Sequence, residues 1–289
     1  MSAARKGTAA PIRRESAKAA PSRRTAAPLG RAPEPGRPSD AGESADRCWS
    51  AGPYDRAVRA GRGPLFLRPS DGRLLPLDVE RWCAEADPAD LTVLRRCEGA
   101  VLDVGCGPGR LLAALDARGR RAMGIDVSQA AVDRAVGLGG HALRRSVFDR
   151  LPGEGGWGTA LLMDGNIGIG GDPRALFARL ARLLTPGGLL IAEPVPQPEV
   201  DERLLAHLTD ARGAIDGPFP WARLGAPALV RHAIGTGWRP EGQWSAGGRC
   251  FVSLRSRATS SSAEQPNRAA VSSSHRPANP VAGSPVNRS

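Results

Sequence analysis

The chain has 289 residues, of which 41% are hydrophobic and 24% charged, as in an average globular domain. Its formal net charge is +11, but residues 1–50 contribute +5 and residues 255–289 contribute +4, so residues 51–254 carry only +2, which argues against a basic nucleic-acid-binding groove there. No run approaches the roughly 18 consecutive apolar residues that a membrane-spanning helix requires, so we predict no such helix.

Both ends of the chain are predicted to be disordered. Residues 1–48 consist mainly of Ala, Pro, Arg, Ser and Gly, and residues 255–289 repeat this composition with runs of serine. Such segments bury too little apolar surface to offset the conformational entropy that folding costs. We therefore expect a disordered basic arm and a disordered tail. A weak electrostatic tether for nucleic acid or an acidic partner is the alternative role of these ends.

Residues 49–97 are predicted to form an N-terminal cap or lid that precedes the main fold. Two short extended pieces within residues 65–77 flank an aspartate-glycine turn. A helix is expected to begin near Asp78. A second is expected after Asp87, where this acidic residue and a proline precede apolar residues.

From residue 98 onward, apolar strands alternate with helical patterns. Strands are expected at 100–104, at 122–126, up to 148, at 159–163 and at 189–192, and helices at 111–115, after Ser128 and over 172–184. This alternation is typical of βαβ units that build a parallel sheet. We therefore predict an α/β fold with a doubly wound, mostly parallel seven-stranded sheet of the Rossmann-like type.

The end of this region has a different pattern. A helix over 227–235 precedes two strands at 243–245 and 249–254, which flank a glycine pair. They predict a hairpin that closes the edge of the sheet, with an antiparallel last strand. The core therefore spans residues 98–254, and residues 195–222 form an insertion before its last helix.

The most informative stretch is the glycine-rich loop between Asp103 and Arg110, which follows a buried strand and opens a helix. Its glycines let the backbone turn tightly and approach a ligand without interference from a Cβ atom. The free amides at the start of the helix favour a carboxylate or a phosphate. Asp126 ends the next strand, 21 residues after Gly105, and from there its carboxylate can accept both hydroxyls of a ribose.

Two kinds of cofactor fit a glycine turn that is followed by a ribose-binding acid. The nicotinamide fingerprint G-x-G-x-x-G requires a small residue at position 110, which is Arg here. The pattern D-x-G-x-G-x-G is matched at all four fixed positions, by Asp103, Gly105, Gly107 and Gly109. In these residues, and in the order of less specific motifs over residues 98–254, the chain resembles the class I S-adenosylmethionine-dependent methyltransferases.

The resemblance implies S-adenosylmethionine as the cofactor, no metal, and a role for each matching residue. Asp126 would hold the ribose and Val127 would line the adenine. Phe148 would form an apolar wall, Asp149 would accept the adenine amino group, and Asp164 lies in the loop that contacts the methionine moiety and the substrate. The implied cofactor-binding residues are Asp103, Gly105, Cys106, Gly107, Gly109, Asp126, Val127, Phe148, Asp149 and Asp164.

Several of these assignments have a purely structural alternative. The three glycines can form a tight turn and nothing more. Asp126 can cap a helix, although Ser128 is already placed to do so. Asp149 can simply begin a loop. Cys106 is predicted as a small side chain that fills tight space rather than as a reactive thiol.

The family has no universal catalytic residue, so the resemblance names no base. Three residues are candidates. His207 lies in the insertion at 195–222, where the family often builds its acceptor site. Asp164 is better motivated as a cofactor contact. Tyr54 precedes the core, where family members often place a lid, and ordinary packing is its alternative role.

The resemblance implies methyl transfer, for which the protein must align a nucleophile with the S–CH₃ bond and exclude water. The chain lacks the Asp/Asn-Pro-Pro-aromatic run of nucleic-acid amino methyltransferases and the Pro-Cys of cytosine carbon methyltransferases. We therefore predict a small-molecule acceptor. A cofactor-binding module without transfer activity and a nucleotide-dependent oxidoreductase are the alternatives.

The five cysteines are odd in number, scattered, and without a C-x-x-C motif. This usage argues against a disulfide framework and against a zinc site. Reduced thiols predict a cytoplasmic protein. The abundance of Ala, Arg, Gly and Pro indicates a GC-rich, bacterial coding sequence.

Overall fold

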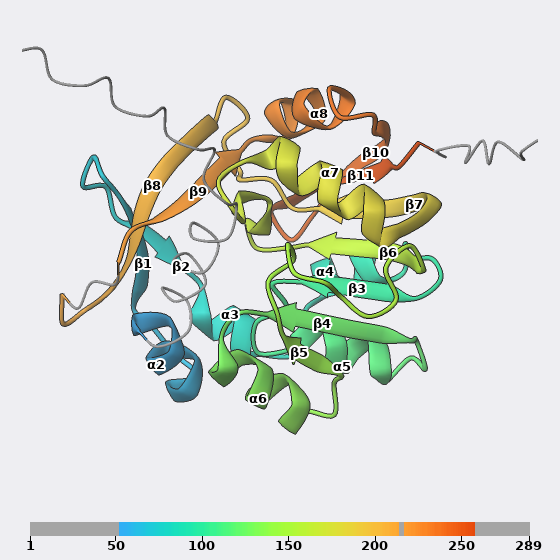
Figure 1. The fold of residues 1–289 in the computed structure, drawn as a ribbon. Coiled ribbons are helices and arrows are strands. Elements are labelled where there is room, and N and C mark those ends of the chain that lie inside the picture. The colour runs from blue at the N-terminus through green and yellow to red at the C-terminus, as the bar shows by residue number, and fades with distance from the viewer. Residues whose placement is uncertain (1–51, 214–216, 258–289) are drawn as a thin grey trace, which may run out of the picture. The chain divides into compact units, whose positions relative to one another are not determined.

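The computed structural model describes residues 52–213 and 217–257. They form two β-sheets, one of seven strands and one of four, with helices packed against them (Figure 1). The predicted disordered arm, residues 1–48, and most of the predicted disordered tail, residues 255–289, lie outside the described residues.

The seven-stranded sheet has the strand order β10-β11-β7-β6-β3-β4-β5. Strands β3 to β7 pair in parallel, whereas β11 is antiparallel to both of its neighbours, β7 and β10. The predicted mostly parallel sheet with an antiparallel last strand is therefore confirmed. The strands are β3 (Val101–Val104), β4 (Ala122–Asp126), β5 (Ala142–Arg144), β6 (Trp157–Leu162), β7 (Leu184–Ala192), β10 (Arg239–Ala246) and β11 (Arg249–Arg255).

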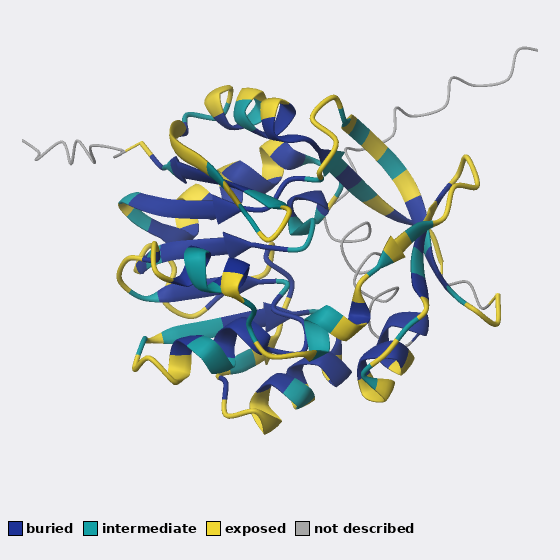
Figure 2. Cartoon of the chain, turned by 180° about the vertical axis from the view of Figure 1, so that it is seen from behind, coloured by how far each residue is buried: buried dark blue, intermediate teal, exposed yellow. Residues whose placement is uncertain are grey.

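Helices cover both faces of this sheet, as a doubly wound fold requires. The helices are α4 (Pro88–Leu94), α5 (Arg110–Asp116), α6 (Gln129–Gly137), α7 (Pro173–Leu183) and α8 (Ala226–Ile234), with a short 3₁₀ helix η1 (Asn166–Gly168). Along β7, Leu190 and Ala192 pack with α7 and α8, whereas Leu189 and Ile191 pack with α4 and α5. Successive side chains of a strand point to opposite faces, so a strand covered on both sides is apolar throughout. The inner strands are accordingly buried (Figure 2).

The four-stranded antiparallel sheet, of order β2-β1-β8-β9, joins two segments that are far apart in the sequence. Its elements are β1 (Leu65–Pro69), β2 (Leu75–Leu77), β8 (Asp201–Asp210) and β9 (Phe219–Leu224), and the helices α2 (Pro53–Ala60) and α3 (Val79–Cys83) belong to the same apolar cluster. The two extended pieces expected around the aspartate-glycine turn are β1 and β2, which pair in antiparallel. The segments 49–97 and 195–222 therefore share one sheet.

The loop after β6 connects this small sheet to the large one. Ile169 forms an isolated antiparallel bridge with Trp221 of β9. At Gly168 the two backbones are so close that a Cβ atom would meet the Ala222 carbonyl oxygen at 2.3 Å. A glycine is required at this contact, because any side chain would push β9 away.

One local prediction was wrong, and one helix was missed. The strand expected to run up to Phe148 is β5, which already ends at Arg144, because the Ser146 amide donates a hydrogen bond to the Asp149 carboxylate at 3.0 Å and residues 146–149 turn. Helix α2 was not predicted, although it begins with a proline and buries Tyr54, Ala57 and Val58 at helical spacing. No helix of the described residues is both long and apolar enough to cross a membrane.

Candidate functional site

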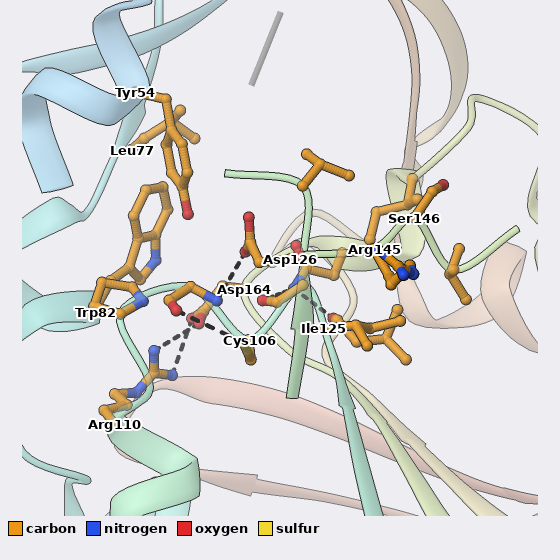
Figure 3. Close-up of a pocket in the computed structure, with 18 of the residues that line it drawn as sticks. Tyr54, Leu77, Trp82, Cys106, Arg110, Ile125, Asp126, Arg145, Ser146 and Asp164 are labelled. Carbon is orange, nitrogen blue, oxygen red and sulfur yellow. Dashed lines mark hydrogen bonds and ion pairs between the residues drawn. The ribbon is translucent and has the colours of Figure 1, made fainter. Parts of the chain in front are cut away.

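A cavity lies where the strands β3, β4 and β6 of the large sheet end, and it encloses about 910 Å³ of empty space including its opening to solvent. Its floor is formed by the loops that follow these strands. Residues of α2, α3, β2 and β9 form its other wall (Figure 3). Open parallel sheets bind their ligands at this edge.

The glycine-rich loop forms part of the cavity floor. Gly105, Gly107 and Gly109 all have positive φ values, of 71°, 53° and 93°. A Cβ at Gly105 would lie 2.5 Å from the Asn166 side chain, and one at Gly109 would lie 2.6 Å from the Ala135 Cβ. These two glycines are needed for close packing, whereas Gly107 turns the backbone beside the cavity.

Asp126 lies at the end of β4 with its carboxylate at the cavity. Its Oδ2 accepts a hydrogen bond from the Gly107 amide and its Oδ1 accepts one from the Ser128 amide, both at 2.9 Å. Burial raises its pKa to about 6, against the opposing effect of these backbone hydrogen bonds. Ser128 itself caps α6 through its side chain. Asp126 is thus held in place by backbone amides and keeps lone pairs for a ligand.

Asp103 and Cys106 are buried behind the loop. Within residues 52–213 and 217–257, the Oδ2 atom of Asp103 has no hydrogen-bond partner, and burial raises the pKa of this carboxyl to about 7. Burial also raises the pKa of the Cys106 thiol. A Cβ at Gly124 would lie 2.6 Å from the Cys106 Sγ, so the thiol fills tight space between two strands, as the sequence predicted. A neutral buried thiol is a poor nucleophile.

Asp164 follows β6 with a φ of 57° and lines the cavity. Its Oδ2 accepts a hydrogen bond from Arg110 Nη1 at 2.7 Å, and its Oδ1 lies 2.6 Å from Arg81 Nη1 of α3 (Figure 3). Its backbone amide donates to Glu193 at 3.0 Å. Left-handed backbone is unusual for a residue with a side chain, and these contacts hold it there.

The ion pairs of Asp164 continue behind the cavity. Arg110 also donates to the fully buried Asp90 of α4, at 2.9 Å and 3.2 Å. Arg249 of β11 donates to Asp90 at 2.8 Å and to both oxygens of Glu193. We call Asp90, Arg110, Asp164, Glu193 and Arg249 the ion network. It ties α4, α5 and β11 to the loops that end β6 and β7.

Not every predicted cofactor-binding residue lies at the cavity. Val127 does, but Phe148 is 45% exposed and Asp149 is exposed and bonded to the Ser146 amide. The wall on that side is formed instead by Arg145, Ser146 and Val147. The structure therefore does not bring Phe148 and Asp149 to the cavity, because β5 ends four residues before Phe148.

Two of the three catalytic candidates line the cavity, Tyr54 and Asp164. Tyr54 is 5% exposed, and burial raises its pKa well above the usual value, so it is a neutral phenol. His207 is absent from the lining. It lies on β8 opposite Arg68, between Ala206 and Leu208, which belong to the apolar cluster of α2.

Trp82, Asn166 and Trp221 also line the cavity, and the sequence analysis assigned no ligand contact to either tryptophan. The Asn166 amide donates to the backbone oxygens of Val104 and Gly105, at 3.0 Å and 2.8 Å, and so joins the two cavity loops. Its position two residues after Asp164 was a usable signal. The sequence held no comparable signal for the two tryptophans, because only the tertiary structure brings α3 and β9 to the cavity.

The chain is similar to known proteins both in sequence and in fold. Residues 101–188 match the model of a family described as a methyltransferase domain. Among solved structures, the chain is similar to an S-adenosylmethionine-dependent methyltransferase from Bacteroides fragilis in complex with S-adenosyl-L-homocysteine. The TM-score is 0.61 and the identity 20%, over 74% of this chain and 96% of that chain. At this identity the likeness shows the fold alone.

Two further solved structures that are similar to the chain have lower TM-scores. A sugar N-methyltransferase from Streptoalloteichus has a TM-score of 0.46 and 21% identity, over 61% of this chain and 88% of that chain. The 1,6-didemethyltoxoflavin-N1-methyltransferase from Burkholderia thailandensis has a TM-score of 0.44 and 17% identity, over 58% of this chain and 75% of that chain. No curated protein matches the chain.

Proposed function

Because residues 101–188 match the model of a methyltransferase domain, we propose that the chain transfers a methyl group from S-adenosylmethionine to a small-molecule acceptor bound in the cavity. The observation that carries this proposal is the Asp126 carboxylate, which two backbone amides hold at the floor of the cavity. A carboxylate fixed in this way can accept the two hydroxyls of a ribose.

The residues at the cavity fit a sulfonium nucleoside. The glycine loop brings bare backbone to the cavity at Gly107, and Asp126 supplies acceptors for the sugar. Val127 and Val147 offer apolar contact for a purine on the same side. The cofactor supplies the electrophilic methyl group. The protein's own part is to bind, to orient the nucleophile and to exclude water.

The other wall of the cavity supports a small acceptor. Tyr54, Leu77, Trp82 and Trp221 come from four different elements and give that wall an aromatic and apolar surface. An apolar site also suits the reaction, because charge disperses when a sulfonium becomes a thioether. Tyr54 and Asp164 remain candidates for contact with the acceptor.

An oxidoreductase function is disfavoured by Arg110. This side chain occupies the position where a nicotinamide fingerprint requires a small residue, and it is engaged with Asp90 and Asp164. A cofactor-binding module without transfer activity would have the same cavity floor as an enzyme, so a measurement of methyl transfer must distinguish the two. The cytoplasmic location, the segment boundaries and the exclusion of nucleic acid as a partner stay predictions.

The first test is calorimetric binding of S-adenosylhomocysteine and of NAD to the purified chain. We expect binding of S-adenosylhomocysteine, and an Asp126→Ala variant that binds it about 1–3 kcal/mol more weakly, because charge-assisted hydrogen bonds are lost. Asp116→Ala is the matched control, since Asp116 is exposed on α5. Unchanged affinity in Asp126→Ala would remove the ribose assignment, and binding of NAD alone would remove the methyltransferase.

Transfer itself is tested with labelled S-adenosylmethionine and a cell extract, followed by mass spectrometry of the labelled products. We expect label in a small molecule. Label in nucleic acid would contradict the acceptor class. Cofactor binding without any labelled product would favour the silent module.

A further inference from the structure

Helix α3 carries a buried hydrogen-bond donor for which the described residues supply no acceptor, Nε1 of Trp82. The described residues likewise leave one buried acceptor without a donor, Oδ2 of Asp103. A buried donor without an acceptor costs on the order of 1–3 kcal/mol, so such groups point to a missing partner.

Trp82 faces the cavity. Its ring lines the cavity next to Tyr54, with the ring centroids 6.1 Å apart (Figure 3). The Tyr54 hydroxyl lies near the glycine loop, where a Cβ at Gly107 would be 3.6 Å from it. The Trp82 N–H is therefore available at the same wall of the cavity, opposite the loop that would hold the cofactor.

Arg81 adds a positive charge next to this donor. Its Nη1 forms an ion pair with Asp164 Oδ1 at 2.6 Å. Arg110 donates to both oxygens of the same carboxylate. Asp164 is thus shared by two guanidinium groups, so part of the Arg81 charge is available to an additional anionic group.

The surrounding charges specify what that group belongs to. Asp103, Asp126 and Asp164 are close enough to one another to raise the pKa of Asp103, after the larger effect of burial. Asp126 and Asp164 at the cavity and the unpartnered Asp103 Oδ2 behind the loop offer acceptors to a cationic group, whereas the Trp82 N–H and the Arg81 charge on α3 favour an anion. A ligand portion that carries both charges close together is the head group of an α-amino acid.

We propose that α3 binds the carboxylate of the cofactor's methionine moiety, with the Trp82 indole N–H as the donor and the Arg81 guanidinium as the charge. This inference rests on the proposed function and deepens it. It makes α3, which precedes the methyltransferase domain in the chain, a determinant of cofactor selectivity. A nucleoside that lacks the amino-acid group gains nothing from α3.

The test compares two ligands that differ in this group, S-adenosylhomocysteine and 5′-methylthioadenosine, by isothermal titration calorimetry. Wild-type protein is expected to bind S-adenosylhomocysteine at least tenfold more tightly. In Trp82→Phe, affinity for S-adenosylhomocysteine should fall about tenfold, because a hydrogen bond to a charged group is lost, while that for 5′-methylthioadenosine stays within about twofold. Arg81→Gln, at a partly exposed position, should show the same selective loss.

Trp244→Phe is the matched control, because Trp244 of β10 is absent from the cavity lining and its Nε1 donates a hydrogen bond elsewhere, to Thr92. It should leave the ratio of the two affinities unchanged. Equal effects of Trp82→Phe on both ligands, or no effect on either, would overturn the role of α3 while leaving the proposed function intact. If the wild-type protein binds neither ligand, the proposed function itself fails, and the inference with it.

Discussion

The two sides of the cavity hold their carboxylates by different means. Asp126 is held by the backbone amides of Gly107 and Ser128, neither of which can be changed by substituting a side chain. Asp164 is held by the side chains of Arg110 and Arg81. The first arrangement comes from the strand–loop–helix unit itself, and the second depends on long side chains that meet from separate elements.

The same difference in partners separates the pKa of Asp126, at the cavity, from that of Asp90, in the ion network behind it. Burial raises the pKa of Asp126 to about 6. Asp90 is buried too, but the hydrogen bonds and charges of Arg110 and Arg249 outweigh that burial and lower its pKa to about 2. Burial outweighs the backbone hydrogen bonds of Asp126 and raises its pKa, whereas the two guanidinium groups outweigh the burial of Asp90 and lower its pKa. The acid at the cavity and the acid in the ion network behind it therefore differ in pKa.

The largest expected effect comes from breaking the ion network. Arg110→Met should lower the free energy of unfolding by about 3 kcal/mol, because it leaves the buried Asp90 with Arg249 as its remaining charged partner. Urea unfolding followed by circular dichroism measures this change. A loss below about 1 kcal/mol would mean that the network adds no more than exposed ion pairs do.

The second prediction sharpens the comparison by pH. Because the folded-state pKa of Asp126 is about 6, above the 3.8 of the unfolded chain, the folded protein binds the extra proton. The contribution of Asp126 to the free energy of unfolding is complete below about pH 4 and is lost as the pH rises through about 6. Relative to Asp126→Asn, the wild-type protein should therefore lose on the order of 3 kcal/mol between about pH 4 and pH 7.

This second prediction is checked by urea unfolding of both proteins across that pH range. The difference between the two proteins removes the contributions of groups that they share. A difference that stays constant, or that grows in favour of the wild-type protein as the pH rises, would contradict the raised pKa of Asp126.

The smallest effect is expected for an exposed ion pair, in contrast to the buried pairs of the ion network. Arg255 on β11 donates to Glu98 at 2.7 Å, and the Glu98 side chain is 55% exposed. Arg255→Met should change the free energy of unfolding by less than about 1 kcal/mol, because water screens the pair. The same urea experiment measures it. A loss as large as that of Arg110→Met would remove the distinction between buried and exposed pairs.

Much of the fold was predictable because its signals are local. The glycine loop, the capping Ser128 and the apolar strands β3, β4 and β6 each depend on residues that are neighbours in the sequence. The end of β5 was not predicted correctly, since the apolar pair Val147-Phe148 continued the strand pattern, whereas a hydrogen bond from the Ser146 amide to the Asp149 carboxylate turns the chain there.

The candidate site divides in the same way. Asp126 and the three glycines lie where their spacing predicted, at the carboxyl ends of two adjacent strands. Arg110 was noticed only as an obstacle to another cofactor, although it is the centre of the ion network. Its partners Asp90 and Asp164 lie 20 and 54 residues away, at distances for which sequence patterns carry no signal.

The sequence by itself determined the parallel sheet, its glycine loop and the acid at the end of the neighbouring strand, because backbone geometry and hydrophobic periodicity act over a few residues. The tertiary structure alone decided that α3 and β9 face that loop. Pairing of β1 with β8 brings residues 65–69 to residues 206–210, and such long-range pairing depends on the packing of the whole sheet rather than on either strand.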